Sequence, residues 1–542
     1  MIRWMAWRLH RRGLLAFTVG GFLISFVYGG AYASAAGTTT ASRAAFGQAI
    51  SAVAGQFAFL IPVPVHPETL GGYEQYKWIW GAIIMMMIWA AVAGIAAGRG
   101  EEERGLTDEW LATGVSRARL LLSRSAAFGL VLTVACFAST LGISAIAPLV
   151  RSDPNLAGEL GKALSMTLGL FCCYAIALLI SQLPSERQTA TAFSVGALVV
   201  LLVISGIADT VPNASWIGVI SPFHWMEKTT SAAPGGTFDV GATSGLALAA
   251  AVLLGISVPI FQSRDVGNGL IRWGRRAPAA VRVASRNVML RLPFTEGLWE
   301  QRVGLAVWVG STFLLGAIMV SVAKSVADAL NADPHLAALF TTAMGGNIYE
   351  GLMGIVWFGV ALLILTGYAV VQVSRWAAQD SEGRVEMLLS TPVSRTRAVI
   401  DRALEFAVAS LLIVIAGSLG VAAKAPSSGL NIAADHLFTS SLLMWPFALA
   451  FGGLGVAVVS RWPRFAVPFL AAFAAIEYFL GDLAPLFKFP GWMANLSVFH
   501  LFGNPLAANS ISWTPPLTMI VVFGVGFAAA LFLMRQRDVS GA

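Results

Sequence analysis

Long apolar runs separated by short polar segments extend along the whole chain. A transmembrane helix needs about 20 mostly apolar residues, and twelve runs of this kind are present, six in each half. This pattern predicts an all-α integral membrane protein with twelve transmembrane helices. The expected spans are 14–35, 79–98, 125–148, 163–182, 190–209, 243–262, 303–323, 351–373, 403–423, 438–459, 464–482 and 515–534.

The first run admits a second interpretation. Arg11 and Arg12 precede it, and it ends in the small residues of segment 31–37, which is the pattern of a secretory signal with a cleavage site. The run is long for a signal peptide. Its removal would leave five spans in the first half and six in the second, so the two halves would no longer match. We therefore interpret it as a transmembrane helix.

Composition excludes several classes of protein. Of the 542 residues, 57% are apolar and 12% are charged, whereas a soluble domain carries about 25% charged residues. A soluble enzyme, a disordered protein and a DNA-binding domain are therefore excluded. Cys136, Cys172 and Cys173 lie in apolar runs without the spacing of a disulfide framework or a metal site, so we interpret them as buried apolar residues.

The basic residues predict an orientation. Cytoplasmic loops of membrane proteins are enriched in Lys and Arg, and most of the 35 Lys and Arg residues fall on one side if the N-terminus is cytoplasmic. An even number of spans then places the C-terminus in the cytoplasm too. The net charge of +7 is thus a topology signal rather than a nucleic-acid-binding surface. We expect a multi-pass protein of a bacterial inner membrane.

The two halves of the chain resemble each other. Loops 104–124 and 382–402 share Val-Ser-Arg-x-Arg, 278 positions apart, and each half ends with Arg-Asp-Val, at 264–266 and 537–539. Because each half has an even number of spans, we expect a parallel repeat of two six-helix halves around a central cavity. The expected domains are a first six-helix half (1–262), a basic cytoplasmic linker with an interfacial helix (263–302) and a second six-helix half (303–542). The interfacial helix is expected around 281–300, and a solvated basic loop in contact with anionic lipid fits this linker equally well.

Each of the paired loops combines an acidic start with a short helix. The charged segments 101–104 and 380–384 are followed by apolar side chains such as Trp110 and Met387. Ser116 and Ser394 then stand at the N-cap positions of the next helices. Apolar side chains within a charged ring are typical of a surface on which a protein partner docks. An interfacial anchor whose Arg side chains reach the lipid headgroups would have the same pattern.

This repeated pattern, an acidic cluster, a short helix and (Gly/Pro)-Val-Ser-Arg-x-Arg, resembles the permease subunits of type-2 ABC exporters. The most similar group is the fused twelve-span permeases that export polyketide antibiotics and other drugs. The resemblance implies that each loop is a coupling helix that docks on one of two copies of a separate ATP-binding subunit. The residues implicated are Glu101, Glu102, Glu103, Arg104, Trp110, Leu111, Arg117, Arg119, Asp380, Glu382, Arg384, Met387, Leu388, Arg395 and Arg397.

The chain itself is expected to be a transport subunit without catalytic residues, cofactor or metal. No Walker A phosphate-binding motif occurs in it, so ATP and magnesium would bind to the partner ATPase. The resemblance further implies a hydrophobic small-molecule substrate that is exported when the cavity switches from inward to outward. The direction of transport rests on this resemblance.

Substrate-binding candidates come from the expected spans. Ionisable groups are few there, which favours an apolar or amphipathic substrate, and Met and aromatic side chains adapt to such ligands. Glu477 could equally be a structural hydrogen-bond partner. The candidates are Met86, Trp89, Trp357, Phe358, Glu477 and Tyr478.

The outer segments 209–242 and 482–514 are too long for tight turns and predict lids that cover the cavity. His224 and His500 occupy corresponding places in them and are candidates for an outer gate. A metal site is not expected there, since no further ligand is spaced nearby.

Two other functions fit twelve spans less well. A proton-coupled drug carrier of the major-facilitator type also has parallel halves and a cytoplasmic linker, but it would need more buried carboxylates and lacks the acidic helical loops. An intramembrane enzyme that acts on lipids would need a catalytic cluster, and the sequence contains no convincing one.

Overall fold

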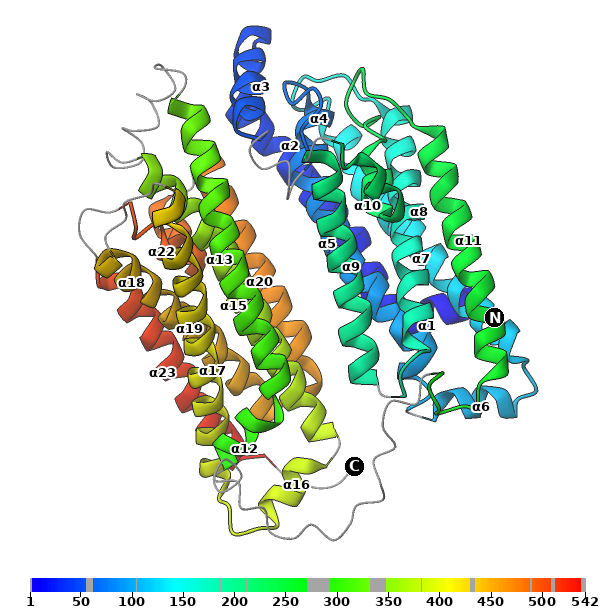
Figure 1. Cartoon of the computed structure of the whole chain (residues 1–542), viewed down its shortest axis with the longest axis vertical. Coiled ribbons are helices and arrows are strands. Elements are labelled where there is room, and N and C mark those ends of the chain that lie inside the picture. Colours follow the sequence, from blue (N-terminus) through cyan, green and yellow to red (C-terminus); the bar gives the residue numbers. More distant parts are fainter. Residues whose placement is uncertain are drawn as a thin grey trace. The chain divides into compact units, whose positions relative to one another are not determined.

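The computed structural model describes residues 2–537 except 55–61, 104, 186, 211–212, 271–292, 332–347, 382, 429–433, 488–489 and 508–511. Every regular element in these ranges is a helix. The chain divides into two compact units, Met1–Ala280 and Val281–Ala542. Each is a bundle of long helices (Figure 1).

Unit 1 contains six long helical spans and several short helices. Three short wider helical turns, Ala16–Gly20, Gln75–Ile79 and Ala96–Gly100, continue neighbouring α-helices without a break. The helices are α1 (Ile2–Leu15), α2 (Gly21–Ala36), α3 (Thr40–Ala54), α4 (Leu70–Glu74), α5 (Trp80–Ile95), α6 (Leu106–Ala112), α7 (Arg117–Ile146), α8 (Leu156–Ser181), α9 (Arg187–Thr210), η5 (Ser215–Ile220), α10 (Pro222–Glu227) and α11 (Val240–Ser263).

Unit 2 has a similar series. Its first helix covers the described part of the predicted interfacial helix, whose residues 281–292 lie outside the described ranges. The helices are α12 (Pro293–Glu300), α13 (Arg302–Asn331), α15 (Ile348–Ser381), α16 (Arg384–Leu389), α17 (Arg395–Lys424), η7 (Pro426–Ser428), α18 (Ala434–Leu442), α19 (Met444–Arg461), α20 (Pro463–Leu486), α21 (Gly491–Ala494), α22 (Val498–Phe502) and α23 (Thr514–Arg535).

Twelve helices of the described chain are long and apolar enough to cross a membrane, one for each predicted run. Several of them begin earlier than the sequence predicts, including the second and the fourth. The second span is Leu70–Gly100 and the fourth is Leu156–Ser181. Both acquire a carboxylate in the additional turns, Glu74 and Glu159, and neither residue is exposed to solvent.

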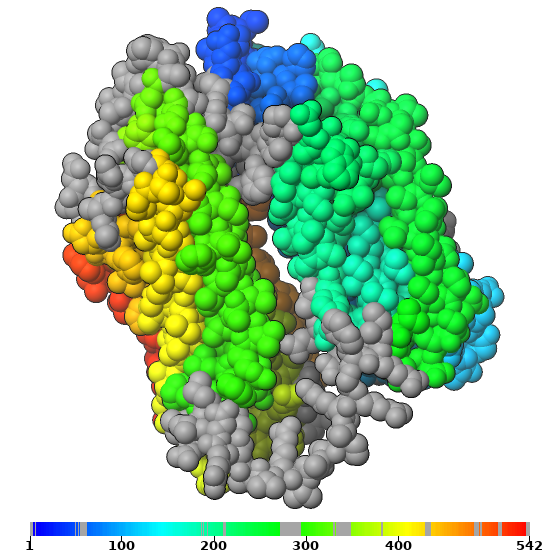
Figure 2. Space-filling model, in the orientation of Figure 1, coloured from blue at the N-terminus to red at the C-terminus, as the bar shows by residue number. Residues whose placement is uncertain are grey.

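Large apolar side chains form the core of unit 1, and other apolar side chains cover its outer surface. The ring of Phe128 lies 5.2 Å from Trp89 and 4.8 Å from Tyr174, which joins α5, α7 and α8. On α11, by contrast, Val240 and Leu248 are each 67% exposed, and this helix forms a surface of unit 1 in Figure 2. Such an apolar exterior suits contact with lipid.

The helices of unit 2 approach one another through small residues. A methyl group added to Gly526 of α23 would lie 2.6 Å from the carbonyl carbon of Gly453 of α19, so only glycine permits this spacing. Close backbone contact at small residues is a common way for membrane helices to pack. Tyr368 stacks on Phe406 at 5.6 Å, which joins α15 to α17.

Candidate functional site

The paired loops fold into short helices for local reasons. Gly105 and Gly383 precede α6 and α16 with φ of +71° and +70°, a conformation that glycine adopts without strain. After each short helix a serine caps the next long one. Ser116 accepts a hydrogen bond from the Arg119 amide at 3.3 Å, and Ser394 accepts one from the Arg397 amide at 3.1 Å. The predicted N-caps are therefore confirmed.

In unit 1 the acidic start of the loop is bound to the end of the last span. Glu102 forms a two-point ion pair with Arg264, at 2.5 and 2.8 Å. The same carboxylate pairs with Arg99 at 2.9 Å. All three side chains are buried, and a buried charge is tolerated only when it is paired. Loop and final helix are thus joined by a buried ion network.

A backbone contact reinforces this connection. The Arg117 guanidinium, at the start of α7, donates hydrogen bonds to the carbonyl oxygens of Gln262 and Arg264. These carbonyls are at the C-terminal end of α11, where a cation is favoured by the helix dipole. Glu101 forms an ion pair with Arg124 on α7. The loop is therefore attached to both the third and the sixth spans of unit 1.

Unit 2 repeats these contacts with its own residues. Arg537, after α23, donates to Asp380 at 2.7 Å. Arg395, at the start of α17, donates to the carbonyls of Met534, Arg535 and Arg537. Asp380 stands 278 positions after Glu102, as Arg395 does after Arg117. We call the pairs Glu102–Arg264 and Asp380–Arg537 the terminal clamps.

The terminal clamps give a physical role to Arg-Asp-Val. The sequence shows that this motif ends each half, but its arginine is more than 150 residues from the loop carboxylate that it binds in each unit. Only the fold brings them together. No hydrophobic or charge periodicity could have paired them.

The predicted coupling residues therefore divide into inward and outward groups. Glu101, Glu102, Arg117, Asp380 and Arg395 bind other parts of their own unit. Glu103 is exposed and accepts a hydrogen bond from the backbone of Arg187. Leu111 and Leu388 are half-buried, and Arg119, Arg384, Met387 and Arg397 are exposed. Arg104 and Glu382 lie outside the described residues.

Trp110 is packed rather than fully presented to solvent. Its ring meets the edge of Trp4 in α1 at 5.7 Å, and Arg8 lies over Trp4 at 5.5 Å. The N-terminal helix therefore supports α6. In unit 2, Met387 is 66% exposed on α16.

The substrate candidates pack mainly within their own units. Met86 and Trp357 have no exposed surface, and Trp89 stacks on Phe17 at 4.9 Å. Phe358 is 2% exposed and meets Phe502 edge-on at 5.1 Å. These side chains form helix contacts in the described structure.

Glu477 and Tyr478 support a short helix of unit 2. The Glu477 carboxylate accepts a hydrogen bond from the Val498 amide at 2.7 Å, and its backbone carbonyl accepts one from Ser497. This carboxylate therefore caps α22. Tyr478 meets Phe499 of the same helix edge-on at 5.6 Å.

The two gate histidines have different surroundings. His224 is buried in α10 and is hydrogen-bonded to Asp209 at 2.8 Å. His500 is exposed on α22. Among the described residues, no group of three His, Cys, Asp or Glu side chains could hold a metal ion.

Unit 1 also contains polar residues that the sequence did not single out as a site. Glu74 accepts a hydrogen bond from Ser25 at 2.7 Å, and Glu159 accepts one from the Ser144 amide at 3.3 Å. Lys162 is 3% exposed. These residues lie in the first turns of the second and fourth spans. The predicted spans began after them, because a charged residue does not count toward an apolar run. Extending each run by two helical turns would have found them.

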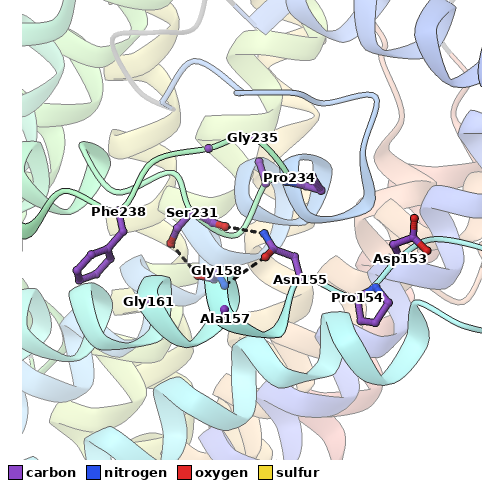
Figure 3. A pocket seen from close by; sticks show the side chains of 12 residues that line it. Asp153, Pro154, Asn155, Ala157, Gly158, Gly161, Ser231, Pro234, Gly235 and Phe238 are labelled. Atoms are coloured by element: carbon purple, nitrogen blue, oxygen red, sulfur yellow. Dashed lines mark hydrogen bonds between the residues drawn. The ribbon is translucent and has the colours of Figure 1, made fainter.

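A cleft of about 700 Å³ opens where loop 231–238 crosses the start of α8. Figure 3 shows Asn155 and Ser231 turned toward each other across it. The Asn155 amide donates to the Ser231 carbonyl at 2.8 Å, and the Ser231 hydroxyl donates to the Gly158 carbonyl at 2.7 Å. These side chains hold the loop on the helix.

Comparison with known proteins agrees with the membrane fold. The family model described as multidrug efflux system permease Rv1217c, C-terminal domain, matches residues 4–262 and 290–535. The chain is 26% identical over 506 residues to the multidrug efflux system permease protein Rv1217c of Mycobacterium tuberculosis (strain ATCC 25618 / H37Rv), which covers 92% of this chain and 87% of the relative. With twelve candidate spans and matches over both units, the chain belongs to the multidrug efflux system permease Rv1217c family.

Proposed function

We propose that this chain is the permease subunit of an ATP-driven exporter of hydrophobic or amphipathic compounds, such as drugs and polyketide antibiotics. Two copies of a separate ATPase subunit bind α6 and α16 on the cytoplasmic side, where both termini also lie. Closure of the ATPase dimer switches a central cavity, formed by two parallel six-helix halves, from inward to outward. ATP and magnesium bind to the partner.

The observation that carries this proposal is the terminal clamp, which occurs in both units. A short helix can transmit a movement only if it is firmly connected to the spans that must move. In unit 1 the connection is made by the buried Glu102–Arg264 pair and by Arg117. Asp380, Arg537 and Arg395 make it in unit 2. Force applied to either loop would reach the third and sixth spans of its unit.

The exposed faces of the short helices supply the docking surface. Asp108 and Glu109 are exposed on α6, whereas Thr107 is buried against unit 1. On α16, Glu386 and Met387 are exposed. An exposed apolar side chain beside carboxylates suits a groove on a partner with basic and apolar residues.

Purification of the tagged chain from its native host in mild detergent tests the proposal. We expect an ATPase to co-purify at two copies per chain. Glu109→Lys and Met387→Glu should reduce the bound ATPase at least tenfold while leaving the chain folded. Trp216→Ala is the matched control, because Trp216 is 75% exposed on η5. Recovery of the chain alone from wild-type cells would refute the proposal.

One observation favours a second function, the proton-coupled carrier. Such a carrier needs buried carboxylates, and the structure places Glu74 and Glu159 inside spans of unit 1 with no exposed surface. Proteoliposomes that contain only this chain distinguish the two functions. Transport of a hydrophobic dye on a proton gradient, without ATPase, would favour the carrier.

A further inference from the structure

Helix α10 is held in unit 1 by a buried lysine. Phe223 and Met226 have no exposed surface and fix the apolar face of this helix. At its C-terminal end, the Lys162 ammonium donates hydrogen bonds to the carbonyls of Met226 and Thr229, at 2.9 and 2.7 Å. A cation is favoured at a helix C-terminus, so Lys162 fastens α10 to α8. Figure 1 shows α6 at the lower end of unit 1 and α10 in its upper half.

A line of hydrogen-bonded titratable groups runs beside this lysine. His224 is bonded to one oxygen of Asp209 at 2.8 Å, and the Asp209 carboxyl is in turn hydrogen-bonded to that of Glu227. The Ser205 hydroxyl donates a hydrogen bond to Glu227 Oε1 at 3.4 Å. Asp209 and Ser205 come from α9, and His224 and Glu227 from α10. The line therefore joins two helices.

Glu227 also faces a small cavity whose lining includes a few polar side chains. Lys162, Gln75 and Tyr76 line it with Glu227, and its volume is about 30 Å³, which is the space of one water molecule. The side-chain amide oxygen of Gln75 is buried with no hydrogen-bond partner among the described residues. A water molecule there would have two or more polar neighbours, as a buried water needs. The cavity thus offers room for one water molecule beside Glu227.

Burial and the neighbouring Asp209 carboxyl favour the protonated form of Glu227. Burial raises the pKa of Glu227 to about 9, and the neighbouring Asp209 carboxyl adds to this effect. Lys162 from α8 and the Ser205 hydroxyl from α9 act in the opposite direction without cancelling it. Gln75 and Tyr76, which face it across the cavity, are uncharged at neutral pH. Two carboxyl groups in hydrogen-bond contact cannot both ionise at little cost, so they share one proton.

We propose that Asp209 and Glu227 form a proton-binding site that links α9 to α10 and exchanges its proton with solvent through the exposed edge of Asp209 and His224. The Asp209 side chain is 30% exposed and that of His224 is 11% exposed. A proton from solvent therefore reaches the buried Glu227 carboxyl through these two side chains.

Loss of the proton has a definite structural consequence. It leaves two carboxylates in contact on α9 and α10, which repel each other. This repulsion between α9 and α10 loosens α10. The proton therefore controls how tightly α10 is held against α8 and α9.

Infrared titration of the purified full chain in detergent tests this site. The carbonyl stretch of a protonated carboxyl group disappears when that group ionises. We expect a component that disappears near pH 9 in the wild type and is lost in Glu227→Gln. Glu109→Gln, which replaces an exposed carboxylate on α6, is the matched control and should retain that component.

Two neighbouring variants test the charge balance. Asp209→Asn removes the repelling carboxylate and should lower the midpoint by about one pH unit. Ser205→Ala removes a hydrogen bond that favours the ionised form and should raise the midpoint slightly, and this small change is compatible with folding even if Glu227→Gln is not. The proposal is overturned if Glu227→Gln leaves the high-pH component in place, or if Asp209→Asn does not lower the midpoint.

Discussion

The terminal clamp of unit 1 predicts a large and specific loss of stability on removal of one carboxylate. Glu102 is the shared partner of Arg99 and Arg264, and the three side chains are at most 4% exposed. Glu102→Ala leaves two buried guanidinium groups without their counter-ion. Breaking a buried ion pair from one side costs about 3–5 kcal/mol, so we expect the free energy of unfolding to fall by that amount.

The effect should be smaller in unit 2. Asp380 is also buried, with 3% of its side chain exposed, but its partner Arg537 is 18% exposed. A partly hydrated guanidinium loses less when its partner is removed. We expect Asp380→Ala to cost about 1–3 kcal/mol, the range for a buried hydrogen-bonding group left unsatisfied.

Unfolding by SDS in mixed micelles, followed by tryptophan fluorescence, measures both changes. Glu109→Ala is the control, because it removes an exposed carboxylate from the same loop. A double-mutant cycle of Glu102→Ala and Arg264→Ala should give a coupling energy of about 1–3 kcal/mol. If Glu102→Ala matches the control to within about 0.5 kcal/mol, the buried clamp does not hold the loop and the reasoning is refuted.

Three further predictions concern other contacts. Glu477→Ala should cost about 1–3 kcal/mol in the same assay, because it leaves the buried Val498 amide without its acceptor, whereas an unchanged stability would exclude the capping role. Trp110→Ala should cost about 0.5–1.5 kcal/mol beyond its buried area through the lost edge-to-face contact with Trp4, and Trp4→Ala combined with it should add little more. The folded chain keeps a proton on Glu227 up to pH about 9, whereas the unfolded chain loses it near pH 4.5, so this group makes stability fall by about 1.4 kcal/mol per pH unit between these values; Glu227→Gln should flatten that slope, and an equal slope in both proteins would contradict the assignment.

The pattern along the chain determined the membrane architecture. Twelve apolar runs predicted twelve helices because a backbone in lipid must satisfy its hydrogen bonds within each helix, and the described structure contains a candidate span for each. Local signals were equally reliable at the paired loops. Ser116 and Ser394 cap the following helices as predicted, since capping depends on residues three positions apart.

Partners distant in sequence were decided by tertiary structure. Glu102 was predicted to face a protein partner, but it is enclosed by Arg99 and Arg264. Glu74 and Lys162 interrupted the apolar pattern and were placed outside the spans, yet the fold buries them beside polar neighbours. Apolar periodicity records which residues avoid water. It does not record which buried charges meet, because that depends on how the helices pack against one another.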